Sequence, residues 1–283
     1  MSRIATLFSE LLSQNKKALI PYVTAGDPYP HVTVPLLHSM VENGANIIEL
    51  GVPFSDPMAD GPVIQKACER ALAGGMSLNA VLDMVREFRT TDKKTPIILM
   101  GYLNPIEAMG YQSFALKAED SGVDGVLVVD MPPEESRPLI RELRNKGIDS
   151  INLLAPTSSD ERIQKIAEVS SGFIYYVSLR GVTGSQEINV AEIVDRLKKI
   201  HAVSDLPVAV GFGIKDAKSA SRVSDIADAV IAGTALVKEI EQLVPELDQE
   251  SDPQIQIKRV STAVNRVLTN IKQGIEERGS AHE

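Results

Sequence analysis

The sequence predicts a single (β/α)8 (TIM) barrel over residues 1–283, with an extra N-terminal helix and extra helices in the βα loops. Two observations predict this fold. Short apolar runs rich in β-branched residues occur eight times along the chain, and segments with helical periodicity separate them. Most of the runs are continuously apolar, which is typical of parallel strands that are buried on both faces. Eight strands that alternate with helices in one chain indicate this type of barrel.

The expected strands define where loops, and therefore functional groups, should lie. They cover residues 18–23, 45–50, 96–101, 125–129, 150–154, 173–177, 207–212 and 229–232. Helices are expected over residues 3–14 and from Val260 to Ile275, where apolar residues recur at helical spacing. A doubly wound open sheet is the alternative. It is disfavoured because the first strand is followed by residues 24–28 (TAGDP) and not by a GxGxxG motif.

The composition excludes several classes of protein. Hydrophobic residues make up 43% and charged residues 24% of the 283 positions, which is ordinary for a globular protein and unlike a disordered chain. The net charge of -9 argues against a nucleic-acid partner. The single cysteine, Cys68, excludes an intramolecular disulfide and a multi-cysteine metal site. The sequence contains neither a long apolar stretch nor a signal peptide. We therefore expect a cytoplasmic protein without a membrane partner. We also expect no metal.

Three glycine-rich turns follow the last three expected strands, at residues 181–184, 211–213 and 233–234. Glycine allows backbone N–H groups to approach an anion, and a helix begins after Gly233 and Thr234. In a barrel these turns are neighbours, and their place matches the usual phosphate site. The alternative is that each glycine only makes a tight turn between a strand and a helix. We predict a phosphate site formed by backbone amides and the Thr234 hydroxyl.

Carboxylates are the candidate acid–base groups, since none of the four histidines lies at an expected strand end. Glu49 interrupts an apolar strand, and the expected strands contain no lysine or arginine that could pair with it. A buried, unpaired carboxylate raises its pKa or takes part in chemistry. Asp56 and Asp60 lie in the proline-rich loop that follows, although both also suit turns and helix caps. Strands without lysine also exclude an aldolase that works through a Schiff base.

Apolar and aromatic residues at the strand ends are candidate walls of a substrate pocket. A flat aromatic substrate that carries a phosphate would suit them, although core packing is the alternative role of the two aliphatic members. The candidates are Tyr22, Met100, Tyr102, Leu127, Tyr175 and Phe212.

Four stretches resemble the tryptophan synthase alpha chain family, over nearly the whole chain. They are residues 21–28 (PYVTAGDP), 48–62 (IELGVPFSDPMADGP), 176–184 (YVSLRGVTG) and 211–214 (GFGI). The resemblance implies a lyase of L-tryptophan biosynthesis that cleaves 1-(indol-3-yl)glycerol 3-phosphate into indole and glyceraldehyde 3-phosphate without a cofactor of its own. It also implies a pyridoxal-phosphate-dependent beta subunit as partner, in an αββα heterotetramer that passes indole between its sites.

The resemblance also assigns roles to individual residues. Glu49 matches the acid–base glutamate and Asp60 matches the aspartate that binds the indole N–H, while Tyr175 and Thr183 match supporting positions near them. The remaining matches are to phosphate-binding positions, namely Gly184, Gly213, Gly233 and Thr234, and to beta-subunit contacts, namely Pro53, Asp56 and Asn104.

Three positions depart from the family pattern: Thr234 stands where serine is common, Leu179 precedes Arg180, and Tyr22 replaces a phenylalanine. Two other functions stay open at this point. One is a phosphosugar isomerase or epimerase on a similar barrel, although most such epimerases use a metal and strand-end histidines are missing here. The other is an inert barrel that serves as an allosteric or channel-forming subunit, although both Glu49 and Asp60 are retained.

Overall fold

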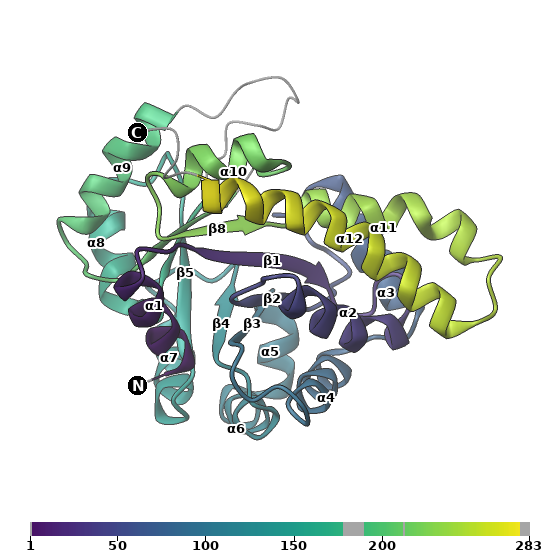
Figure 1. The fold of residues 1–283 in the computed structure, drawn as a ribbon. Coiled ribbons are helices and arrows are strands. Elements are labelled where there is room, and N and C mark those ends of the chain that lie inside the picture. The colour runs from purple at the N-terminus through teal and green to yellow at the C-terminus, as the bar shows by residue number, and fades with distance from the viewer. Residues whose placement is uncertain (1, 178–189, 212, 278–283) are drawn as a thin grey trace.

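A closed barrel of eight parallel strands forms the centre of the molecule in the computed structural model, which describes residues 2–177, 190–211 and 213–277 (Figure 1). Each strand pairs with the next in the chain, and β8 pairs with β1, so the open-sheet alternative is excluded. The strands are β1 (Ala18–Thr24), β2 (Ile48–Gly51), β3 (Ile97–Gly101), β4 (Gly125–Val128), β5 (Asp149–Leu154), β6 (Ile174–Val177), β7 (Val208–Gly211) and β8 (Ala229–Ala232).

Helices surround the barrel and confirm the extra elements expected in the loops. Two helices follow each of β2, β3 and β8. The helices are α1 (Arg3–Ser13), α2 (Pro30–Glu42), α3 (Pro62–Ala73), α4 (Leu78–Phe88), α5 (Leu103–Met109), α6 (Tyr111–Ser121), α7 (Arg137–Asn145), α8 (Asp160–Val169), α9 (Val190–His201), α10 (Ala217–Ser224), α11 (Thr234–Leu247) and α12 (Pro253–Glu276).

The strand boundaries agree with the sequence prediction to within one residue except at the start of β2, where the prediction began three residues too early. The side-chain oxygen of Asn46 accepts a hydrogen bond from the Leu19 N–H at 2.8 Å, and the Asn46 N–H donates to the Leu19 carbonyl at 2.9 Å. Asn46 thus closes the junction with β1 partly through its side chain, so β2 starts only at Ile48, and its ladder with β1 starts at Glu49. Ile47 is nevertheless fully buried, which explains the misleading apolar pattern.

The first and last helices close the two uncovered parts of the barrel. In Figure 1, α1 lies at the end of the barrel where β1 begins, and its residues Ile4, Phe8 and Leu11 pack into the barrel interior. Arg3 fixes this helix through an ion pair with Asp124 at 2.7 Å. At the other side, α12 packs against α2, α10 and α11. The mouth formed by the carboxyl ends of the strands is therefore left for function, as expected for this fold.

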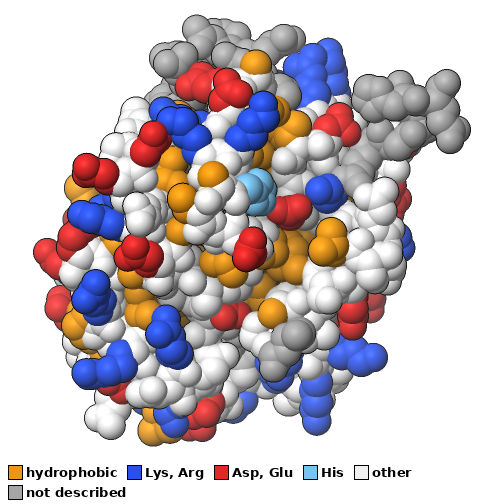
Figure 2. Space-filling model, turned by 90° about the vertical axis from the view of Figure 1, so that its left-hand side faces the viewer, with side chains coloured by type: hydrophobic (Ala, Val, Ile, Leu, Met, Phe, Trp, Pro, Cys, Tyr) orange, Lys and Arg blue, Asp and Glu red, His pale blue; other side chains and the backbone are white. Residues whose placement is uncertain are grey.

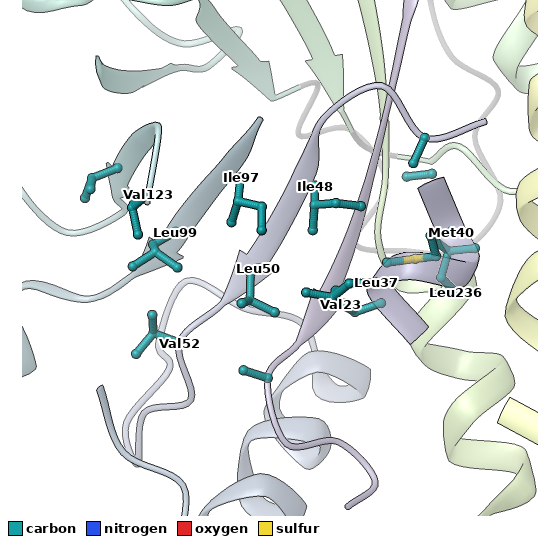
Figure 3. Close-up of a cluster of buried hydrophobic side chains, with 14 of the residues drawn as sticks. Val23, Leu37, Met40, Ile48, Leu50, Val52, Ile97, Leu99, Val123 and Leu236 are labelled. Atoms are coloured by element: carbon teal, nitrogen blue, oxygen red, sulfur yellow. The ribbon is translucent and has the colours of Figure 1, made fainter. Parts of the chain in front are cut away.

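Residues of each strand alternate between two apolar cores, and this alternation orients the functional residue of β2. Figure 3 shows Ile48 and Leu50 of β2 among the side chains between the barrel and the helices, where Leu37 and Met40 of α2 also lie. Successive side chains of a strand point to opposite faces. Glu49 therefore points into the barrel.

The described surface mixes charges of both signs. On the face drawn in Figure 2, acidic and basic side chains are interspersed among small apolar areas. Among the described helices, none is both long enough and apolar enough to cross a membrane. Among the large apolar side chains of the described residues, Met58, in the loop between β2 and α3, is the most exposed, at 85%.

Candidate active site

Glu49 is a buried carboxyl group without a partner. Its side chain points into the barrel from β2, the residue is 1% exposed, and neither Oε1 nor Oε2 has a hydrogen-bond partner among the described residues. Burial, and secondly the negative charge of Asp60, raise the pKa of Glu49 to about 8. At neutral pH this group is therefore protonated in most molecules and can act as a proton donor.

Asp60 lies in the loop between β2 and α3, and Tyr102 binds it there. The Tyr102 hydroxyl lies 2.8 Å from Oδ2 of Asp60 and 3.0 Å from the backbone nitrogen of Ala59. Burial raises the pKa of Asp60, and the hydrogen bond from Tyr102 opposes that rise. Asp60 is close enough to Glu49 for its charge to raise the pKa of Glu49, so the site holds two carboxyl groups in different surroundings.

Tyr22 connects the strand of Glu49 with the turn after β8. Its Cα is paired with that of Glu49 in the β1–β2 register, and its hydroxyl lies 3.2 Å from Oγ1 of Thr24. A Cβ added to Gly51 would lie 2.2 Å from the Tyr22 hydroxyl, and one added to Gly233 would lie 3.3 Å from the Tyr22 Cβ. The ring therefore needs the glycine at position 51 and forms one wall of the mouth.

Tyr175 approaches the same space from β6. A Cβ added to Gly211 would lie 2.5 Å from the Tyr175 hydroxyl, so this glycine leaves the room that the phenol occupies. Burial, followed by the charges of Glu49 and Asp60, raises the pKa of Tyr175. Tyr175 therefore lies within reach of the charges of both carboxyl groups.

The predicted phosphate turns that are described lie next to each other, because β7 pairs with β8. Gly213 is exposed and has a φ of +74°, and Gly233 precedes the exposed Thr234 at the start of α11. The neighbouring α10 has its first turn capped by the Asp216 side chain, whereas α11 has no side-chain cap. The first N–H groups of a helix have no partner within the helix, so α11 presents donors that suit an anion.

The other predicted site residues have different surroundings. Met100 is partly buried and packs near Tyr22, whereas Leu127 is 0% exposed within the barrel core. Of the residues expected at a beta-subunit contact, Pro53 is buried, and Asp56 and Asn104 are exposed. Three predicted site residues lie outside the described residues: Thr183, Gly184 and Phe212.

The sequence prediction did not include two residues that position Tyr22 in the site, Thr24 and Gly51. It indicated Tyr102 only as a pocket wall. Thr24 follows Tyr22 by two positions, so the period of a strand places both side chains on the inner face. The same period places Gly51 beside Glu49. That signal was available in the sequence. The contact between Tyr102 and Asp60 was not, because it joins residues 42 positions apart through the shape of a loop.

Comparisons with known proteins agree with this geometry. A family model described as "Tryptophan synthase alpha chain" matches residues 8–270. The tryptophan synthase alpha chain of Nitrosococcus oceani is 62% identical over 242 residues, which cover 86% of this chain and 89% of that one. The crystal structure of tryptophan synthase subunit alpha from Legionella pneumophila is 45% identical, with a TM-score of 0.87 and coverage of 98% of this chain and 99% of that one.

A solved structure of a tryptophan synthase complex, from Pyrococcus furiosus, includes a chain that is 36% identical to this one. The TM-score is 0.77, and the match covers 91% of this chain and 98% of that one. The agreement therefore extends over almost the whole fold. The chain belongs to the tryptophan synthase alpha chain family.

Proposed function

We propose that this chain catalyses the retro-aldol cleavage of 1-(indol-3-yl)glycerol 3-phosphate into indole and glyceraldehyde 3-phosphate. One observation carries the assignment of roles within the site. Glu49 is a buried carboxyl group with a pKa near 8, it has no partner among the described residues, and it shares its space with Asp60. A group that is neutral at pH 7 can give up a proton and then take one back, which this reaction needs at adjacent atoms.

Glu49 acts as the acid and then as the base. Its carboxyl proton goes to ring carbon C3 of the indole, which turns the ring into an electron sink. The bond between C3 and the glycerol carbon then breaks, and its electron pair returns to the ring. The hydroxyl proton on that glycerol carbon goes to the Glu49 carboxylate while the carbonyl of the aldehyde forms. Glu49 ends in its starting state, so the proton and electron balance closes without a cofactor of this chain.

Asp60 stabilises the positive charge that the protonated ring carries. Its carboxylate accepts a hydrogen bond from the indole N–H, and this interaction strengthens as the ring becomes cationic. An interaction that is stronger in the transition state than in the ground state lowers the barrier. Tyr22, Met100, Tyr175 and Phe212 would enclose the ring. Leu127 supports this wall from the barrel core below.

The phosphate binds at the glycine turns after β7 and β8. The N–H groups of Gly213 and of the first turn of α11, with the Thr234 hydroxyl, supply donors, and Gly184 adds to them. Tyr22 lies between the two parts of the proposed site, because its Cβ is close to Gly233 and its hydroxyl is close to Gly51, which follows Glu49 on the inner face of β2. The family resemblance supports a supporting role for Thr183.

A beta subunit is the partner of proteins of this family, and we propose the αββα stoichiometry with indole passed between the subunits. The partner would supply the pyridoxal phosphate. Asp56 and Asn104 are exposed on the side of the mouth and suit direct contact, whereas Pro53 is buried and would act by shaping the loop. We further propose that the whole chain acts as one domain in the cytoplasm.

The test is an indole-release assay on the purified chain, alone and with a beta subunit. We expect slow release alone and faster release with the partner. Release that stays absent in both conditions, with intact binding of indolepropanol phosphate, would show an inert barrel. Isomerisation of a phosphorylated sugar in place of indole release would support the isomerase alternative and refute the proposal.

A further inference from the structure

Tyr102 contacts the loop that carries Asp60 at three points. The residue follows β3 directly and is 4% exposed. Its hydroxyl bonds to Oδ2 of Asp60 at 2.8 Å and to the N–H of Ala59 at 3.0 Å, and its ring stacks on Phe54 with 5.2 Å between the ring centroids and 27° between the ring planes. One side chain at the end of β3 thus connects a strand of the barrel with the loop of the neighbouring strand.

The chemistry of these contacts determines where the phenol proton lies. A backbone N–H can only donate, so the Tyr102 oxygen accepts from Ala59 and gives its own proton to Asp60. Burial and the nearby charge of Asp60 raise the pKa of the phenol, which keeps that proton in place. No described residue donates a hydrogen bond to Oδ1, the second oxygen of Asp60. As far as the described residues go, Oδ1 can accept a hydrogen bond from the ring N–H of a substrate.

We propose that Tyr102 is a positioning residue, whose hydroxyl fixes the carboxylate of Asp60 so that Oδ1 meets the indole N–H. The inference rests on the proposed function and deepens it. Asp60 lies on a loop, and a loop alone holds a side chain less firmly than a strand does. The double hydrogen bond of Tyr102 places Asp60 relative to β3 instead.

The hydroxyl also affects the charge of Asp60. A hydrogen bond donated to a carboxylate favours its ionised form, so removing the donor raises the pKa of Asp60. The reaction needs ionised Asp60, and the acid limb of the pH–rate profile should therefore move to higher pH when the hydroxyl is lost. The titratable groups that act on Asp60, or on which it acts, are Tyr22, Glu49, Cys68, Tyr102 and Tyr175.

Tyr102→Phe is the direct test, because it removes the hydroxyl and keeps the ring. We expect kcat for indole release to fall about ten- to a hundredfold, the range for a misplaced catalytic group, with a smaller change in KM and an acid limb shifted upward. Tyr111→Phe is the matched control: it removes a phenol that faces Glu107 of α5 at 3.3 Å, outside the site, and should leave all three quantities unchanged.

Two further variants separate positioning from packing. Phe54→Leu removes the ring stack but keeps the hydroxyl, so the acid limb should stay in place. In an Asp60→Asn background, Tyr102→Phe should lower kcat much less than it does in the wild type, because residues that act as a unit are not additive.

The results distinguish this inference from the proposed function. A wild-type chain without indole release refutes the function itself. An active wild type whose Tyr102→Phe variant keeps its kcat and its acid limb refutes only the positioning role. A fall in kcat without a shift of the acid limb, or full additivity with Asp60→Asn, would also overturn it. Each variant is assayed at a temperature at which its thermal melting curve shows it folded.

Discussion

Glu49→Gln is expected to lower kcat for indole release at least about a hundredfold, the usual scale for a positioned acid–base group. The glutamine has nearly the same shape as the protonated glutamate, and it adds no charge to a site that is 1% exposed. The fold and the affinity for indolepropanol phosphate should therefore be retained. The substitution removes the group that, in the proposed mechanism, gives a proton to ring carbon C3 and takes one from the glycerol hydroxyl.

Turnover is measured by indole release under saturating substrate, and binding is measured by calorimetry with indolepropanol phosphate. Glu69→Gln, at an exposed position of α3, serves as the matched control and should behave as the wild type. If Glu49→Gln keeps near-normal turnover, Glu49 has no part in the mechanism.

Asp60→Asn is expected to lower kcat about a hundred- to a thousandfold, as is typical when an electrostatic stabiliser of a transition state is lost. Asparagine can still accept a hydrogen bond from the indole N–H, so substrate binding should weaken much less than turnover. It has no negative charge, and so it cannot stabilise the cationic ring. The loss should therefore be seen mainly in kcat.

The same assay, run with a series of substrate concentrations, separates kcat from KM. Asp83→Asn, on the exposed side of α4, is the control for a lost carboxylate charge. A variant at Asp60 that raises KM and leaves kcat unchanged would assign this residue to ground-state binding alone.

The fold was predictable from the sequence because both signals that it needs are local. Buried parallel strands produce continuous apolar runs, and eight of them separated by helices leave few other topologies. The error at the start of β2 has the same origin. Ile47 is as buried as its neighbours, but Asn46 makes part of its contact with β1 through its side chain, which apolar patterning does not register.

The site was predictable to a lesser extent. Strands without lysine or arginine indicated that Glu49 has no cation beside it, and the structure confirms that its oxygens have no partner among the described residues. The place of Tyr175 follows from its strand. The sequence did not predict the bond from Tyr102 to Asp60, because the path of a loop depends on contacts between distant residues. Leu127 is apolar and lies in β4, so patterning alone could not decide between the mouth and the core.

The titration of the Glu49 carboxyl group tests the central claim most directly. The chain is labelled with carboxyl-¹³C glutamate, its chemical shifts are followed by NMR as a function of pH, and the Glu49 signal is identified by its loss in Glu49→Gln. Burial without a partner predicts a midpoint near pH 8, so that the group is a proton donor at neutral pH. A midpoint near the ordinary glutamate value of about 4.3 would mean that Glu49 is ionised at neutral pH and would contradict the account.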